Sequence, residues 1–142
     1  MMMRAVIYVS HGSRLKEAQA QVAEFMESCM SAIDVPIQEY CFLELAAPSL
    51  KEGVERCIER GAMKIAIAPL LLLLTGHAKR DIPQQVKRLQ TEYPNVIFTY
   101  GQPLGVQDAI MDIVVERMLE QQATIEKDAR ILLVGRGSSD PD

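Results

Sequence analysis

The chain has 142 residues, of which 49% are hydrophobic and 24% are charged, as is normal for a single globular domain. A formal net charge of -4 gives no general attraction to nucleic acid or to an anionic membrane. The longest apolar run, residues 65–74, contains Pro69 and is far shorter than the roughly 20 residues of a membrane-spanning helix. We therefore expect a cytoplasmic protein that binds neither nucleic acid nor membrane.

Segments typical of strands alternate with segments typical of helices along the chain. The strand-like runs are residues 5–10, 35–43, 64–70, 96–100 and 130–134. The first helix has a predicted apolar stripe at Leu15, Ala18, Val22, Phe25, Cys29 and Ile33, and the last helix has one at Val106, Ile110, Ile113, Val114 and Met118. This order predicts an α/β fold with three α/β/α layers and a four- to five-stranded parallel sheet.

The two middle helices have recognisable ends. Ser49 opens a Ser-Leu-Lys-Glu capping box, and the helix that follows runs to about Arg60, where Gly61 suits its end. The next helix buries a stripe around Val86 and stops at Pro94.

The three cysteines, Cys29, Cys41 and Cys57, show no CxxC spacing. They fall at apolar positions of predicted helices and strands, so we expect buried, reduced thiols that are poor zinc ligands.

Both histidines of the sequence lie beyond a predicted strand and beside a glycine. His11 follows residues 5–10, and His77 follows residues 64–70. These two strands are commonly neighbours in a doubly wound sheet, so we expect the imidazoles to meet at one rim. A lone histidine is usually structural, but imidazole suits iron, cobalt and nickel, and glycine leaves space for a ligand. The pair predicts a metal site.

Glu44 lies just past the second predicted strand, between apolar residues. It is either a surface residue at a strand end or an acid of the site. Two imidazoles and one carboxylate would hold a divalent ion and leave coordination positions open.

Basic residues collect near the same loops: Arg14, Lys79, Arg80 and Arg136. Each alone is typical of a solvated surface. Together they would neutralise a polyanionic ligand, because arginine binds carboxylates through two parallel hydrogen bonds. The leucines of residues 70–74 are either core or the floor of a flat apolar pocket.

Residues 130–138 repeat the pattern of residues 5–13, an apolar run followed by x-Gly-Ser, with Arg136 in the place of His11. Either two strand-to-loop turns are alike, or a second homologous half begins near Arg130. The expected organisation is a domain over residues 1–129, followed by a strand and loop over residues 130–142, which in the second interpretation begin that further half.

Other chemistries lack their motifs. No GxGxxG, GxxxxGK[ST] or GxSxG pattern follows a predicted strand, so we expect no nucleotide or organic cofactor. A phosphoryl-transfer enzyme with a catalytic His-Gly loop would need an arginine before the histidine, where this chain has Ser10.

Four segments resemble the sirohydrochlorin chelatases, the class II cobaltochelatases and ferrochelatases of cobalamin and sirohaem synthesis. They are residues 11–14 (His-Gly-Ser-Arg), 44–49 (Glu-Leu-Ala-Ala-Pro-Ser), 69–78 (Pro-Leu-Leu-Leu-Leu-Leu-Thr-Gly-His-Ala) and 134–141 (Val-Gly-Arg-Gly-Ser-Ser-Asp-Pro). The resemblance implies a chelatase-like fold and the insertion of Co2+ or Fe2+, with Ni2+ as a further metal, into sirohydrochlorin, a carboxylate-rich tetrapyrrole.

The resemblance also implies roles for individual residues. By the resemblance, His11, His77 and Glu44 would be the catalytic and metal-binding residues. We further expect Ser13, Arg14, Lys79 and Arg80 to bind the substrate, with the basic side chains holding its carboxylates. Members of the family are short subunits that dimerise or long chains with two homologous halves, which implies a homodimer or a second half as the partner. A carrier that binds the metal or the tetrapyrrole without catalysis is the alternative function.

Metal insertion needs a partly desolvated ion, the removal of two pyrrole N–H protons and a macrocycle held over the metal. Imidazole titrates near neutral pH, so histidines can hold the ion or accept the protons. This scheme requires neither a redox step nor nucleotide energy.

Overall fold

The structure, a computed structural model, describes residues 2–72, 77–121, 126–135 and 137, without the side chains of residues 77 and 78. The elements in these residues are β1 (Met3–Ser10), α1 (Lys16–Ala32), β2 (Ile37–Phe42), α2 (Leu50–Glu59), β3 (Ala62–Pro69), α3 (His77–Glu92), β4 (Ile97–Tyr100) and α4 (Asp108–Gln121). None of these helices is both long enough and apolar enough to cross a membrane.

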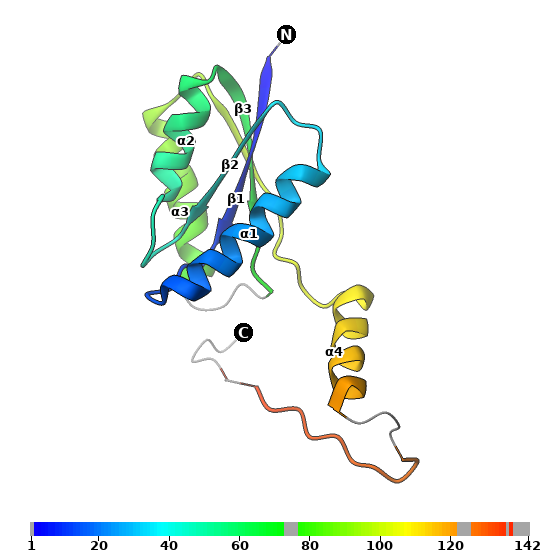
Figure 1. The fold of residues 1–142 in the computed structure, drawn as a ribbon. Helices are drawn as coiled ribbons and strands as arrows, with labels where there is room; N and C mark the ends of the chain where they lie inside the picture. The colour runs from blue at the N-terminus through cyan, green and yellow to red at the C-terminus, as the bar shows by residue number, and fades with distance from the viewer. Residues whose placement is uncertain (1, 73–76, 122–125, 136, 138–142) are drawn as a thin grey trace.

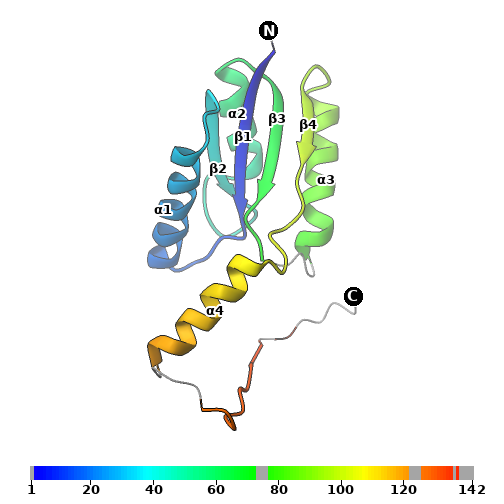
Figure 2. The same ribbon diagram turned by 90° about the vertical axis from the view of Figure 1, so that its right-hand side faces the viewer.

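The four strands form one parallel sheet (Figure 1), and Figure 2 shows their order, β2-β1-β3-β4. β1 is internal and pairs with β2 from Ala5 to Ser10 and with β3 from Met3 to Val9. The predicted neighbourhood of the first and third strands is therefore confirmed. Because every pair is parallel, the carboxyl ends of all four strands lie at one edge of the sheet.

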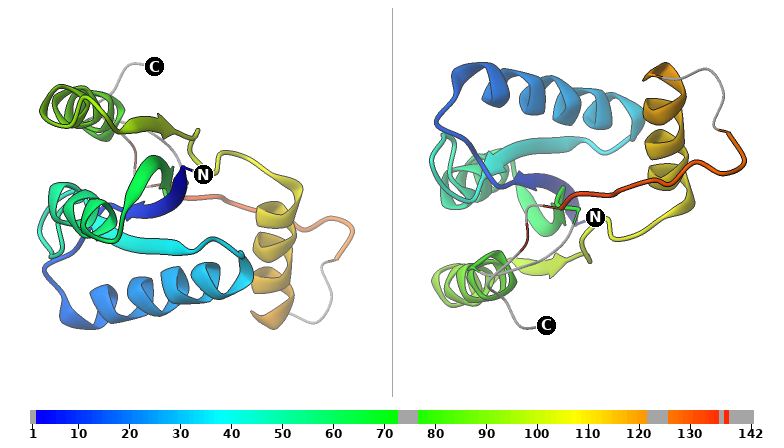
Figure 3. Two further views of the ribbon diagram at one scale, coloured as in Figure 1. Left: turned by 90° about the horizontal axis from the view of Figure 1, so that it is seen from above. Right: turned by 90° about the horizontal axis from the view of Figure 1, so that it is seen from below.

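Helices cover the sheet on both faces, as predicted. α1 lies on one face, whereas α2 and α3 lie on the other (Figures 2 and 3). The side chains of β1 alternate accordingly: Ile7 and Val9 belong to the core under α2, and Tyr8 packs with Met26 of α1. The arrangement is a three-layer α/β/α fold with a four-stranded parallel sheet.

The buried face of α1 differs from the predicted stripe. Phe25 is 54% exposed, while the adjacent Met26 is fully buried against the sheet. Val22, Cys29 and Met30 pack around Met26 and follow the three- and four-residue spacing of one helical face. Several faces of this helix contain apolar residues, and the angle at which α1 docks on the sheet decides which face is covered.

The predicted capping box at the start of α2 is confirmed. The Ser49 hydroxyl accepts a hydrogen bond from the Glu52 backbone N–H at 3.3 Å, and the Glu52 carboxylate accepts one from the Ser49 backbone N–H at 2.7 Å. The Ser49 hydroxyl also donates to the Glu52 carboxylate at 2.8 Å, and the two bonds that this carboxylate accepts from Ser49 lower its pKa. Gly61 follows the helix with a φ of +91°, as its predicted place at the helix end requires.

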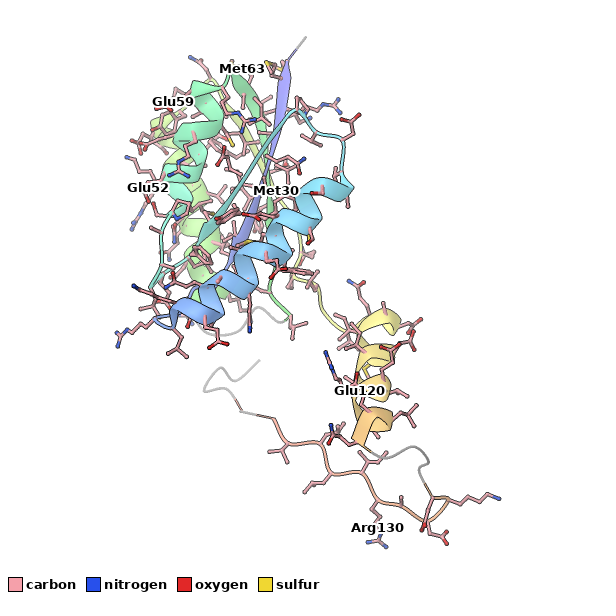
Figure 4. All side chains as sticks on the ribbon, in the orientation of Figure 1. Met30, Glu52, Glu59, Met63, Glu120 and Arg130 are labelled. Atoms are coloured by element: carbon pink, nitrogen blue, oxygen red, sulfur yellow. The ribbon has the colours of Figure 1, made fainter. Side chains whose placement is uncertain are left out.

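The structure assigns no strand to residues 130–134, where the sequence pattern predicted one. Only the start of the segment lies near α4 (Figure 4): Arg130 and Ile131, with Ala129, line a groove of about 530 Å³ together with side chains of α4. A strand needs a neighbouring chain to pair with, and neither edge strand of the sheet, β2 or β4, pairs with this segment. Leu132 and Val134 are 86% and 85% exposed, and α4 has no buried residue.

The predicted burial of the cysteines holds for Cys41 and Cys57, whereas Cys29 is only partly buried. Burial raises the pKa of the Cys41 thiol, and it raises that of Cys57 to about 12. Both thiols are therefore protonated at neutral pH, and a protonated thiol is neither a nucleophile nor a metal ligand.

We predict that iodoacetamide labels only Cys29 in the folded protein at pH 7.5, because Cys41 and Cys57 combine burial with a raised pKa. Peptide mass spectrometry after short labelling measures this, and labelling in denaturant provides the reference for complete reaction. Fast native labelling of Cys41 or Cys57 would show that the α2 layer does not seal the sheet.

Gln38 joins the end of α1 to the sheet. Its Nε2 donates to the carbonyl oxygens of Met30 at 2.9 Å and Ile33 at 3.0 Å, with a longer contact to Val35 at 3.3 Å. Its Oε1 accepts from the Tyr8 hydroxyl at 2.9 Å. One amide thus satisfies carbonyl groups at the end of α1 that the helix itself leaves without partners.

We predict that Gln38→Ala lowers the free energy of unfolding by about 1–3 kcal/mol, because partly buried carbonyl and hydroxyl groups lose their partner. Urea denaturation followed by circular dichroism measures this change. Gln21→Ala is the control, since Gln21 is exposed on α1, and it should change stability by less than about 0.5 kcal/mol.

Candidate metal centre

The order of the strands places three of the predicted site residues at one edge of the sheet. His11 comes immediately after β1, and Glu44 comes two residues after β2. His77 is the first residue of α3, the helix that follows β3. Because β1 lies between β2 and β3, these segments leave the sheet at the same edge. Ligand sites of open α/β sheets lie outside the carboxyl ends of the strands, where these residues are found.

His11 and Glu44 are brought together. The His11 Nε2 lies 3.4 Å from the Glu44 Oε1, and the two side chains are 57% and 54% exposed. A metal ion about 2.1 Å from each atom would bind both at an angle of about 108°, close to tetrahedral. The pair is therefore spaced as two ligands of one ion, and its exposure leaves the other coordination positions open to water or substrate.

Stability does not explain why the chain holds this pair together. An ion pair this exposed contributes little to the free energy of unfolding, because water screens it. The loop that carries Glu44 is nevertheless tightly defined. The Phe42 N–H donates to the Pro48 carbonyl at 2.8 Å and closes the loop, and Leu45 has a φ of +62°. Leu45 in the left-handed region is unusual for a non-glycine residue, and unusual backbone conformations cluster at functional sites.

The third predicted ligand, His77, has a described backbone, but its side chain lies outside the described residues. Its role as a ligand stays a prediction. Among the side chains that the structure describes, no cluster of three or more His, Cys, Asp or Glu residues is arranged to hold a metal ion.

The predicted basic residues lie around the same edge, except Arg136, which lies outside the described residues. Arg14 is exposed on the loop after His11, and Lys79 and Arg80 are exposed on the first turn of α3. No acidic residue occupies that first turn. The amino end of a helix carries a partial positive charge, which is normally matched by acidic residues. The start of α3 is therefore well suited to attract anions.

Ser13 has a local structural contact. Its Oγ accepts a hydrogen bond from the Leu15 N–H at 3.1 Å, and its carbonyl oxygen accepts one from the Gln19 Nε2 at 2.5 Å. These bonds shape the turn between His11 and α1. The Ser13 hydroxyl proton is available to a ligand acceptor, so the predicted substrate role stays open.

The leucine run after β3 begins as an extension of the sheet. The Leu70 N–H donates to the Val9 carbonyl, and the Leu71 and Leu72 carbonyls accept from Leu104 and Gly105, each at 2.8 Å. Leu72 is 60% exposed, so the run leaves the core here. This exposure favours the predicted apolar floor of a pocket for Leu72, while residues 73 and 74 lie outside the described part of the chain.

The close contact between Gly12 and the Glu44 backbone was not predicted. Gly12 has a φ of +100°, and a Cβ at this position would lie 1.8 Å from the Glu44 carbonyl oxygen. The sequence signal was the glycine beside His11, which predicted space for a ligand but not the segment that packs against it.

Comparison with known proteins identifies the family. The CbiX family model matches residues 5–121. The chain is 54% identical over 139 residues to the sirohydrochlorin ferrochelatase of Priestia megaterium, covering 98% of this chain and 52% of that protein. It is 35% identical over 144 residues to the sirohydrochlorin cobaltochelatase of the same organism, covering 99% of this chain and 46% of that protein.

The fold is also shared. SirB from Bacillus subtilis with Fe3+ matches this structure with a TM-score of 0.92 and 46% sequence identity, over 99% of this chain and 56% of that chain. The chain thus spans about half the length of these relatives. The family model covers most of the chain, including the predicted positions His11, Glu44 and His77, and the chain belongs to the CbiX family.

Proposed function

We propose that this chain inserts a divalent metal ion, Co2+ or Fe2+, into sirohydrochlorin. The observation that carries the proposal is the exposed His11–Glu44 pair, which is spaced for one ion at the carboxyl edge of the sheet. Membership of the CbiX family supports the reaction, and similar proteins are named for both iron and cobalt insertion. Imidazole and carboxylate bind both metals, so the donor set itself accommodates either ion.

The pair is suited to delivering an ion. Two ligands hold the ion in place, while the remaining positions keep water that the macrocycle nitrogens can replace one at a time. Because the side chains of His11 and Glu44 are each more than half exposed, the flat face of the ring can approach the ion. His77, at the start of α3, would supply a third ligand from the neighbouring loop.

The same atoms can accept the protons that insertion releases. Two N–H bonds of the ring break as two nitrogen–metal bonds form, and two protons must leave. As the ion moves to the ring, the Nε2 of His11 and the carboxylate of Glu44 lose their metal bonds and become free to accept these protons. The oxidation state of the metal is unchanged, so electrons balance without a co-reactant.

The basic residues would hold the substrate. Arg14, Lys79 and Arg80 surround the edge at which the metal would bind, and the start of α3 adds its own positive charge. Carboxylates at the periphery of a tetrapyrrole can reach such groups while the ring centre lies over His11. Leu72, exposed at the same edge, would contact the apolar face of the ring.

We also propose that a second unit of the same fold packs against α4 and residues 130–134. Either a second copy of the chain or a further homologous half of a longer chain can supply it. The exposed apolar side chains of this segment, among them Leu132 and Val134, would then be buried. A unit in this position lies beyond the carboxyl edge of the sheet, where it would cover the substrate (Figure 2). The free thiols described above fit action in the reducing cytoplasm.

The experiment that tests the function is an insertion assay on this chain with sirohydrochlorin and Co2+ or Fe2+, followed by the absorption spectrum of the ring. Conversion to the metal complex at a rate above the uncatalysed rate supports the proposal. Tight binding of sirohydrochlorin with no faster conversion identifies a carrier instead. Light scattering, recorded in parallel, gives the number of copies in the active species.

We predict that His11→Ala lowers the rate of metal insertion at least about 100-fold, because the substitution removes an imidazole that acts both as a metal ligand and as a proton acceptor. The same change should alter the free energy of unfolding by less than about 0.5 kcal/mol, since the side chain is largely exposed. Parallel insertion assays and thermal denaturation separate the two effects. Wild-type activity in a folded His11→Ala protein would remove His11 from the mechanism.

We predict that Arg80→Gln raises the KM for sirohydrochlorin roughly fivefold with little change in kcat, because an exposed pair of charges contributes up to about 1 kcal/mol. Arg88→Gln is the matched control. It removes the same charge from the same helix but lies two turns further from the edge, and it should leave KM unchanged. Equal effects of both variants would indicate a general loss of positive charge rather than a contact at Arg80.

A further inference from the structure

Backbone pairing between the first two strands continues past the end of the sheet. The last pair of the β1–β2 ladder is Ser10 with Phe42. Beyond it, the Leu43 N–H donates to the Ser10 carbonyl at 2.9 Å, and the Glu44 N–H donates to the His11 carbonyl at 3.1 Å. The two candidate ligands are therefore joined through their backbones as well as facing each other through their side chains.

Gly12 lies at the centre of this junction. A Cβ placed on Gly12 would be 1.8 Å from the Glu44 carbonyl oxygen and 3.0 Å from the carbonyl carbon. Both obstructing atoms belong to the backbone, so no side-chain rotation can relieve the overlap. The oxygen would have to retreat from 1.8 Å to beyond 3.0 Å, and the Glu44 N–H bond to His11 would be strained or broken.

We propose that Gly12 is the positioning residue of the metal site: its lack of a side chain lets the Glu44 backbone lie against the His11 loop, and this contact sets the distance between carboxylate and imidazole. The inference rests on the proposed metal-binding role of His11 and Glu44. Metal–ligand distances tolerate changes of only about 0.2 Å, which is much smaller than the displacement that a Cβ would force.

A second glycine provides a matched control. Gly61 also has a positive φ, +91°, so alanine there would suffer a similar backbone strain. Its Cβ would meet only the Met3 sulfur, at 3.5 Å, which is an ordinary contact. Gly61 precedes β3 and lies next to Met3, at the amino end of the sheet and far from the candidate metal site. The two glycines share the backbone strain and differ in the overlap with Glu44.

The test compares Gly12→Ala and Gly61→Ala in the full chain. Amide hydrogen exchange by NMR reports the backbone junction without metal, and calorimetric titration with Co2+ alone reports the site. We expect both variants to have lower melting temperatures. Only Gly12→Ala should lose exchange protection at Leu43 and Glu44, and only this variant should bind Co2+ at least tenfold more weakly than the unsubstituted chain.

A second substitution keeps the test decisive if Gly12→Ala folds poorly. Asparagine tolerates left-handed backbone better than alanine but brings the same Cβ. Gly12→Asn should therefore fold more stably and still lose both the exchange protection and the Co2+ affinity. Protection and affinity within twofold of Gly61→Ala in either Gly12 variant would overturn the inference.

The two proposals fail in different ways. If the unsubstituted chain does not bind Co2+, the metal-binding function is overturned. The exchange data still decide whether Gly12 holds the Glu44 backbone against the His11 loop. If the unsubstituted chain binds Co2+ and the Gly12 variants bind it equally well, the function stands and the positioning role of Gly12 is overturned.

Discussion

The placement of β1 between two parallel partners is the constraint on which the rest of the structure depends. β1 pairs with β2 along one edge and with β3 along the other, and its side chains enter both apolar layers. Parallel strands end at one edge, so the segments that follow β1 and β2 leave the sheet side by side. His11 and Glu44, far apart in the sequence, meet there because the core beneath them holds these two strands in register.

Sequence pattern correctly predicted those parts of the fold whose contacts are made by residues close to one another in the sequence. Ser49 and Glu52 satisfy each other's backbone groups, so the start of α2 follows from four residues. The buried face of α1 depends instead on how the helix docks, and Met26 is covered where Phe25 was expected. Residues 130–134 have the composition of a strand, but strand formation requires a partner, which composition does not describe.

The same distinction, between what local sequence pattern predicts and what packing decides, applies to the candidate site. His11, Glu44 and the basic start of α3 were predicted because side-chain chemistry at strand ends is visible in the sequence. The contact of Gly12 with the Glu44 carbonyl was not predictable, because every residue has the same carbonyl group and no sequence pattern marks the one that is approached. The residue types of the site can thus be predicted from sequence, whereas their spacing comes from backbone packing. The role of His77 as a metal ligand stays a prediction, since only its backbone is described.

The burial of the Cys41 thiol bears on how long an ion would stay at the proposed metal site. Cys41 lies on β2, one residue from its end and three residues before Glu44, yet its side chain is sealed in the core as a protonated thiol. Thiolate sulfur binds iron and cobalt strongly, and such a ligand at the edge of the sheet would act as a thermodynamic trap. With the Cys41 sulfur kept below the surface, an ion at the proposed site would meet the nitrogen and oxygen donors of His11 and Glu44. The metal would then stay exchangeable, a property that a delivery site needs more than it needs affinity.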